Sequence, residues 1–115
     1  LVDAAGAWGD AVARLAGVRP LGLQPKRRTA LIVDPGPHDC SGWPLLGDAD
    51  HTWYVRPEAR RKLMVSPADE TGSDPCDAQP EEIDVALAVE RMQAALGIRV
   101  RRGEHRWAGL RTYTP

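Results

Sequence analysis

The stretch Thr52-Trp-Tyr-Val-Arg-Pro-Glu-Ala-Arg-Arg-Lys-Leu-Met-Val-Ser66 decides the fold class of this chain. Its two ends, residues 52–56 and 62–66, are rich in the aromatic, β-branched and other apolar residues that favour strands. The residues between them predict a turn, so a hairpin is the economical interpretation. Because a hairpin pairs its strands antiparallel, we expect an antiparallel sheet.

Further strands are predicted on both sides of the hairpin. Residues 21–33 end in the apolar run Ala30-Leu-Ile-Val33 and are closed by turn residues, and Pro25 is expected at the start or on an edge of this strand. The remaining strand candidates are a stub at Leu1-Val2 and short strands at 98–101 and 104–110. Residues 38–50 predict a loop, with Trp43 and Leu45-Leu46 as its anchors on the core.

Two segments have helical spacing. Trp8, Val12, Leu15 and Ala16 recur at that spacing before Gly17. A longer helix is predicted from Pro80, through the acidic turn Glu81-Glu-Ile-Asp84, to Gly97. Its apolar stripe comprises Val85, Val89, Met92 and Leu96, widened by Ile83, Leu87 and Ala94. The fold class is therefore α+β, an antiparallel or mixed sheet with two main helices.

Composition excludes several classes of protein. The 115 residues suffice for one core, and a net charge of −1 argues against a dedicated nucleic-acid binder. No apolar window is long enough to span a membrane, and the first residues lack the basic region of a signal peptide. Cys40 and Cys76 could pair in a secreted protein, but nothing else indicates export. We therefore expect reduced thiols and a cytoplasmic protein.

The segment Trp107-Ala-Gly-Leu-Arg-Thr-Tyr-Thr-Pro115 is the first candidate binding element. Arg111 has the planar donor fork that holds a carboxylate bidentately, with the hydroxyls of Thr112 and Tyr113 nearby. The alternative is an exposed arginine at a strand end. A terminus directly after pocket-type side chains leads us to expect an internal fragment of a longer protein.

Other candidate residues lie on the predicted strands. Arg27 and Arg28 alternate faces, so one of them is expected above a ligand and the other elsewhere, unless both form a solvated basic end. Tyr54 is either a core aromatic residue or a pocket wall. A basic-patch binding module remains a further alternative. It would use Lys26, Arg27, Arg28, Arg60, Arg61 and Lys62.

Cofactor chemistry has weaker local signals. The small residues of Asp3-Ala-Ala-Gly-Ala-Trp8 would allow close approach of a cofactor, although they serve packing at a tight turn equally well. The His and Cys residues form no C-x-x-C or H-x-x-x-H pair, so no metal site is predicted. Neither G-x-G-x-x-G nor G-x-x-x-x-G-K-[ST] occurs, so the chain carries no phosphate-binding loop of its own.

Six segments, taken in order, resemble the D-amino-acid oxidase superfamily of FAD-dependent oxidoreductases, with D-arginine-dehydrogenase-like and glycine-oxidase-like members the most similar. They are Asp3–Trp8, Pro20–Thr29, Trp53–Pro57, Ser66–Glu70, Asp77–Glu81 and Trp107–Arg111. The resemblance implies that residues 1–18 belong to the FAD-binding domain and residues 19–109 to the substrate-binding domain. Residues 110–115 would then begin the return to the FAD-binding domain.

The resemblance also implies site residues. Arg111 falls on the carboxylate-binding arginine of the family, Arg28 on a second arginine, and Tyr54 on a tyrosine that closes the substrate pocket. Ala5, Gly6 and Trp8 fall on the turn that passes close to the flavin.

The implied reaction is oxidation of a D-amino acid or related amine to an imino acid by hydride transfer to FAD. The implied partner is thus a small amino acid or amine, and no general base is identifiable in the chain. The non-enzymatic alternative is a folded module without flavin or activity.

Overall fold

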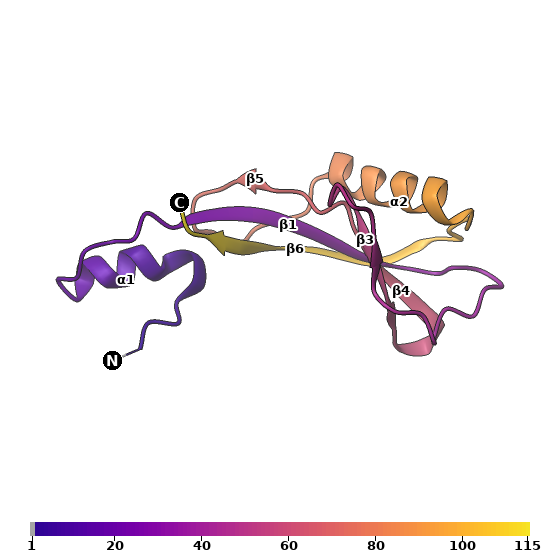
Figure 1. The fold of residues 1–115 in the computed structure, drawn as a ribbon, viewed down its shortest axis with the longest axis horizontal. Coiled ribbons are helices and arrows are strands. Elements are labelled where there is room, and N and C mark those ends of the chain that lie inside the picture. Colours follow the sequence, from indigo (N-terminus) through magenta and orange to yellow (C-terminus); the bar gives the residue numbers. More distant parts are fainter. Residues whose placement is uncertain (1) are drawn as a thin grey trace.

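The computed structural model describes residues 2–115, which form one antiparallel sheet and two helices (Figure 1). The elements are, in order, η1 (Gly6–Trp8), α1 (Gly9–Leu15), β1 (Gln24–Val33), β2 (Leu46–Gly47), β3 (Tyr54–Glu58), η2 (Ala59–Arg61), β4 (Lys62–Ser66), β5 (Thr71–Gly72), α2 (Glu82–Leu96) and β6 (Gly103–Tyr113). This arrangement confirms the predicted α+β class. Within residues 2–115, neither helix is long and apolar enough to cross a membrane.

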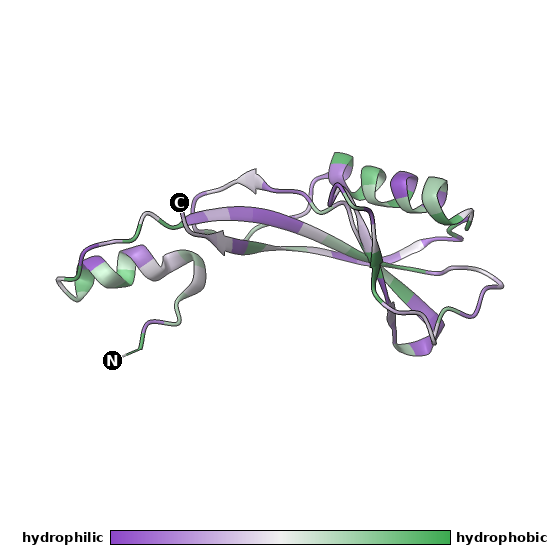
Figure 2. Ribbon diagram, in the orientation of Figure 1, coloured by the Kyte–Doolittle hydropathy of each residue, from purple (hydrophilic) through white to green (hydrophobic). Residues whose placement is uncertain are grey.

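The long strand β1 is the centre of the sheet. Its second half pairs with β4, its first half pairs with β5, and β6 pairs with it over its whole length. Strands β3 and β2 follow beyond β4. Figure 2 shows that β1 changes from hydrophilic in its first half to hydrophobic in its second half, where the core lies.

The core lies between α2 and the sheet. Leu31 and Val33 of β1 are buried together with Ala88 and Met92 of α2, and β3 and β4 contribute Val55, Leu63 and Val65. These strand residues share one face, because Leu31 pairs with Val65 and Val65 pairs with Val55. The predicted stripe on α2 is confirmed in its centre, whereas Ile83 is 61% exposed.

The hairpin is confirmed, with shifted bounds. Strand β3 begins at Tyr54 and runs to Glu58, because only Ala59–Arg61 are needed for the turn. Arg60 and Arg61 both have left-handed backbone angles, which allow the chain to reverse within three residues.

Other predicted bounds were wrong. Val2 lies in no strand, and Leu1 lies outside the described residues. Residues 98–101 form no strand, because Asp34 instead exchanges backbone hydrogen bonds with Arg101 and Arg102. Pro80 is not the first helical residue, since Glu81 has an extended backbone and α2 begins at Glu82.

The long loop is anchored differently from the prediction. Trp43 and Leu46 pack against the core, but Leu45 is 63% exposed, and the short strand β2 interrupts the loop. Cys40 is buried, Cys76 is exposed, and both thiols are free.

The first helix lies at the far end of the molecule from α2 (Figure 1). Its Asp10 carboxylate accepts three backbone hydrogen bonds, each 2.9 Å, from Leu21, Gly22 and Leu23. Burial alone would raise the pKa of Asp10, but these three donors outweigh it and lower the pKa. Asp10 thereby ties α1 to the chain that leads into β1.

Candidate functional site

A pocket of about 590 Å³ lies on the face of the sheet opposite α2. It is lined by Arg28, Leu45, Gly47, Asp48, His51, Trp53, Tyr54, Ala68, Glu70, Arg111 and Tyr113. The three predicted substrate-binding residues, Arg28, Tyr54 and Arg111, are all among them. The structure therefore brings together residues that are up to 83 positions apart in the sequence.

Strand register explains why these residues meet. Arg28 pairs with Gly109 and Lys26 pairs with Arg111, so the even residues of β1 and the odd residues of β6 share a face. That face carries Arg28, Arg111 and Tyr113, whereas Arg27 points to the face covered by α2. The choice of Arg28 over Arg27 as the pocket arginine thus agrees with the register.

Arg28 is largely buried and held on one edge of its guanidinium. Its Nε donates to the backbone oxygen of Asp69 at 2.9 Å, and its Nη2 lies 3.0 Å from Oε1 of Glu70. The same Nη2 also donates to the hydroxyl of Tyr113 at 3.1 Å. Within residues 2–115, Nη1 has no protein acceptor.

Glu70 is the centre of this polar group. Its Oε1 accepts a hydrogen bond from Tyr113 at 2.7 Å, and its Oε2 accepts one from Lys26 at 3.1 Å. These hydrogen bonds, that of Tyr113 first, hold the pKa of Glu70 below its ordinary value. Lys26 also lies 4.6 Å from the centroid of the Tyr113 ring, a cation–π geometry.

Arg111 differs from Arg28. It lines the same pocket and is exposed, and no carboxylate of the described chain lies within 4.0 Å of it. All of its guanidinium donors are therefore available to a ligand. A carboxylate is the ligand that such a planar fork fits best.

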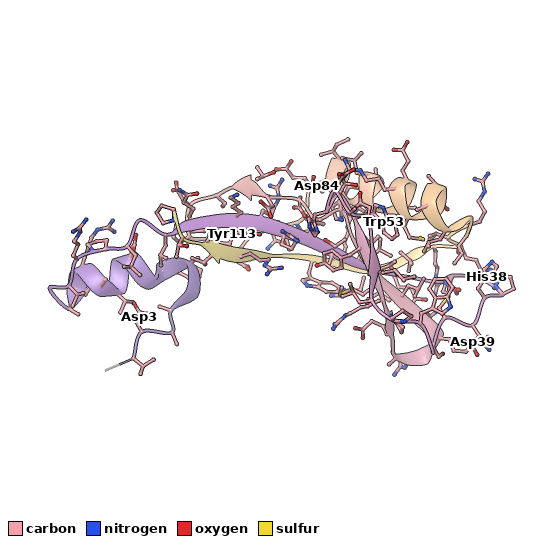
Figure 3. The ribbon with its side chains drawn as sticks, viewed as in Figure 1. Asp3, His38, Asp39, Trp53, Asp84 and Tyr113 are labelled. Carbon is pink, nitrogen blue, oxygen red and sulfur yellow. The ribbon has the colours of Figure 1, made fainter. Side chains whose placement is uncertain are left out.

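The opposite wall of the pocket is formed by residues of the segment 45–54, which include the aromatic residues Trp53 and Tyr54. Asp48 holds this segment by accepting hydrogen bonds from the backbone nitrogens of Thr52 and Trp53 and from the Thr52 hydroxyl. The bond from the Thr52 hydroxyl is the main reason that the pKa of Asp48 is lowered. Through these hydrogen bonds Asp48 fixes the shape of the wall that carries Trp53 and Tyr54. Trp53 is labelled in Figure 3.

The predicted cofactor residues lie at a second groove. Ala5, Gly6 and Trp8 line a cavity of about 530 Å³ together with Cys76–Ala78 and Ala108–Leu110. Around Ala5–Ala7 its wall consists of backbone and methyl groups, whereas Trp8 adds an indole ring. Gly6 has a φ of +57°, which favours glycine. A Cβ at Gly109 would meet no atom within 4 Å, so the strand itself does not require glycine there.

The six residues proposed for a basic patch do not form one surface. Lys26 and Arg28 pair with Glu70, Arg27 pairs with Glu81 and Asp84, and Lys62 pairs with Asp34 and Glu104. Arg60 and Arg61 lie in the turn between β3 and β4, next to Lys62 and not on β1, and Arg61 pairs with Asp39. No group of three potential metal ligands occurs among residues 2–115.

Sequence reasoning missed Glu70 and the loop residues Asp48, His51 and Trp53. The acidic pair Asp69-Glu70 was visible after the second hairpin strand, but its partners lie more than 40 residues away. Tyr113 was named as a hydroxyl donor near Arg111, and it does line the pocket. Thr112, named with it, points to the other face.

The chain also resembles a known protein family over its whole length. A family model described as FAD dependent oxidoreductase matches residues 1–115.

Proposed function

The chain belongs to the DAO family of FAD-dependent oxidoreductases, and from that premise we propose that it supplies the substrate-binding part of an enzyme that oxidises a D-amino acid or related amine to an imino acid. One observation carries this proposal. Arg28, Tyr54 and Arg111 line a single pocket, in which Arg111 has no acidic partner among the described residues. A pocket with one unpaired guanidinium is suited to a ligand with one carboxylate.

In the proposed role, Arg111 binds the substrate carboxylate through two parallel hydrogen bonds. Arg28 contributes its remaining Nη1 from the neighbouring strand. Trp53 and Tyr54 cover the substrate from the loop side and exclude water. Fixing the carboxylate in this way orients the Cα hydrogen of the substrate, which is the main contribution that a protein makes to a hydride transfer.

The groove at η1 has small residues that support a close approach of the flavin ring there. Its lining of Ala5, Gly6 and Ala7 has no side chain larger than methyl, and the position of a Cβ on Gly109 is open. We propose that Ala5, Gly6 and Trp8 lie against the cofactor. When bound, FAD supplies the hydride acceptor.

The dinucleotide part of FAD requires more than this chain contains. The sequence has no Gly-rich phosphate-binding loop. We propose that residues outside the 115 form that site, that residues 1–18 belong to the flavin-binding domain, and that residues 19–109 form the substrate-binding domain.

Substitution of Arg111 tests the proposal in the full-length protein. We expect a yellow, FAD-containing protein in which Arg111→Met raises the KM for a D-amino acid about 100-fold, the effect of losing two hydrogen bonds to a charged group. Arg111→Lys keeps the charge but not the fork, so its KM is expected to lie between those of Arg111→Met and the wild type.

The matched control is Arg99→Met, which removes an exposed arginine that lies at another cavity, beside the end of α2. It is expected to leave KM unchanged. Turnover of D-amino acids that survives Arg111→Met without change would remove Arg111 from this role, and a colourless full-length protein would contradict the flavoenzyme itself.

A further inference from the structure

We propose that the turn Ser66-Pro-Ala-Asp-Glu70 is a positioning element of the substrate pocket, in which Glu70 sets the orientation of Arg28 and Tyr113 before a ligand binds. This inference rests on the proposed function. The turn carries two adjacent carboxylates, Asp69 and Glu70, and neither has a role in the proposed reaction.

The chain changes direction directly after β4, which ends at Ser66. Ser66 is buried, its Oγ accepts a hydrogen bond from the backbone nitrogen of Ala68 at 3.1 Å, and Ala68 has a φ of +55°. A residue with a Cβ adopts this left-handed conformation at an energetic cost, so the surrounding contacts must maintain it.

Asp69 supplies those contacts. Its carboxylate accepts hydrogen bonds from the backbone nitrogen of Thr29 at 2.6 Å and from the Thr29 hydroxyl at 2.9 Å. On this side, β1 pairs with β5 at residues 26–27 and with β4 at residues 31–33. Between the residues of β1 that pair with β5 and those that pair with β4, Asp69 therefore supplies hydrogen bonds from its side chain. These bonds also direct the next residue, Glu70, over the pocket.

Glu70 follows Asp69 and lies over the pocket. Its carboxylate contacts side chains from two paired strands, Arg28 and Lys26 of β1 and Tyr113 of β6. The Arg28 guanidinium is then held through Nε by the Asp69 carbonyl and through Nη2 by Glu70 and Tyr113. Only Nη1 remains for a ligand.

The consequence is an asymmetric carboxylate site. Arg111 offers its whole fork and Arg28 offers one nitrogen in a fixed direction, because the turn has already used the other edge. A group that is held in place before binding loses little conformational entropy when the ligand arrives. Glu70 is therefore a positioning residue and not a ligand of the substrate.

The test compares Glu70→Ala, Glu70→Gln and Tyr113→Phe in the full-length, flavin-loaded protein. Three quantities are measured: KM and kcat for a D-amino acid, and, by calorimetry, the Kd of benzoate, a carboxylate that is not oxidised. For Glu70→Ala we expect KM and the benzoate Kd to rise about tenfold, as for loss of one hydrogen bond to a charged group, with a smaller change in kcat. Glu70→Gln keeps an acceptor oxygen and should recover part of the loss.

Controls separate positioning from general effects. Asp74→Asn removes an exposed carboxylate outside the turn, four residues after Glu70, and should leave all three quantities unchanged. Because Glu70 and Tyr113 act through one contact, the double variant Glu70→Ala/Tyr113→Phe should lose less than the product of the two single losses.

The outcomes are distinguishable. If the wild-type protein binds benzoate and Glu70→Ala binds it equally well, this inference is wrong while the proposed function stands. If the wild-type protein neither binds benzoate nor oxidises amino acids, the proposed function and this inference fall together.

Discussion

Arg27 and Arg28 are consecutive residues of β1, yet they belong to different regions of the molecule. Arg27 points to the face covered by α2, where its Nη2 lies 2.8 Å from Asp84 and its Nη1 lies 2.5 Å from Glu81. Arg28 points to the pocket, where Glu70 and Tyr113 hold one edge of it. The two side chains have the same chemistry and similar burial, and only the side of the sheet differs.

The two faces differ in how their charges are balanced. On the helix face, Arg27 and Arg106 both pair with acidic residues at the start of α2. Carboxylates are favourable there, because they lie near the positive end of the helix dipole. On the pocket face, Glu70 pairs with Arg28, whereas Arg111 has no acidic partner among residues 2–115. The helix face is thus built for stability and the pocket face for binding.

The largest expected effect on stability is that of Arg27→Met. It leaves the largely buried carboxylates of Asp84 and Asp69 without their cation, so the free energy of unfolding should fall by about 3 kcal/mol. Urea denaturation measures this loss. The KM of the folded fraction should not change, because two hydrogen bonds from Thr29 still hold Asp69. A raised KM with unaltered stability would contradict the division between the two faces.

Arg28→Met should affect KM more than stability, the reverse of Arg27→Met. Its KM for a D-amino acid is expected to rise about tenfold, because one charged hydrogen-bond donor to the carboxylate is lost. The free energy of unfolding should fall by about 1 kcal/mol, since Glu70 retains Lys26 and Tyr113 as partners. Steady-state kinetics and urea denaturation of the same preparation provide the comparison, and a stability loss as large as that of Arg27→Met would undo it.

The smallest effect concerns pH. The folded state lowers the pKa of Glu70, through the Tyr113 hydroxyl first and Lys26 second. The ionised Glu70 therefore contributes stability that is fully present above the unfolded pKa of about 4.3 and is lost as the pH falls through the lower folded pKa. As the pH is lowered from about 6 to 3, the urea midpoint of unfolding should fall less steeply for Glu70→Gln than for the wild type. Parallel curves of midpoint against pH would mean that Glu70 contributes nothing to this dependence.

Local sequence predicted much of the architecture. The 52–66 hairpin, the strand ending in Ala30–Val33 and the acidic start of the second helix were all visible, because strand propensity, apolar periodicity and helix-start signals act within a few residues. The errors were mostly at boundaries. Residues 98–101 form no strand: Arg101 bonds to the backbone of Asp34, more than 60 residues earlier, and the backbone nitrogen of Val100 donates to the side chain of Gln93.

The candidate site was predictable only in part. Arg28, Tyr54 and Arg111 were identified by family resemblance, and they do share a pocket. Glu70 was not identified, because an acidic residue in a polar turn has no local signal for the arginine or the tyrosine that it will contact.

The sequence by itself determined the alternation of Arg27 and Arg28, since side chains on any strand point to opposite faces in turn. Only the tertiary structure decided which of them enters the pocket. That choice depends on the side of the sheet that α2 covers and on the pairing of Arg28 with Gly109 of β6. A period of two is a local property of the chain, whereas its phase relative to the core is set by contacts between residues far apart in sequence.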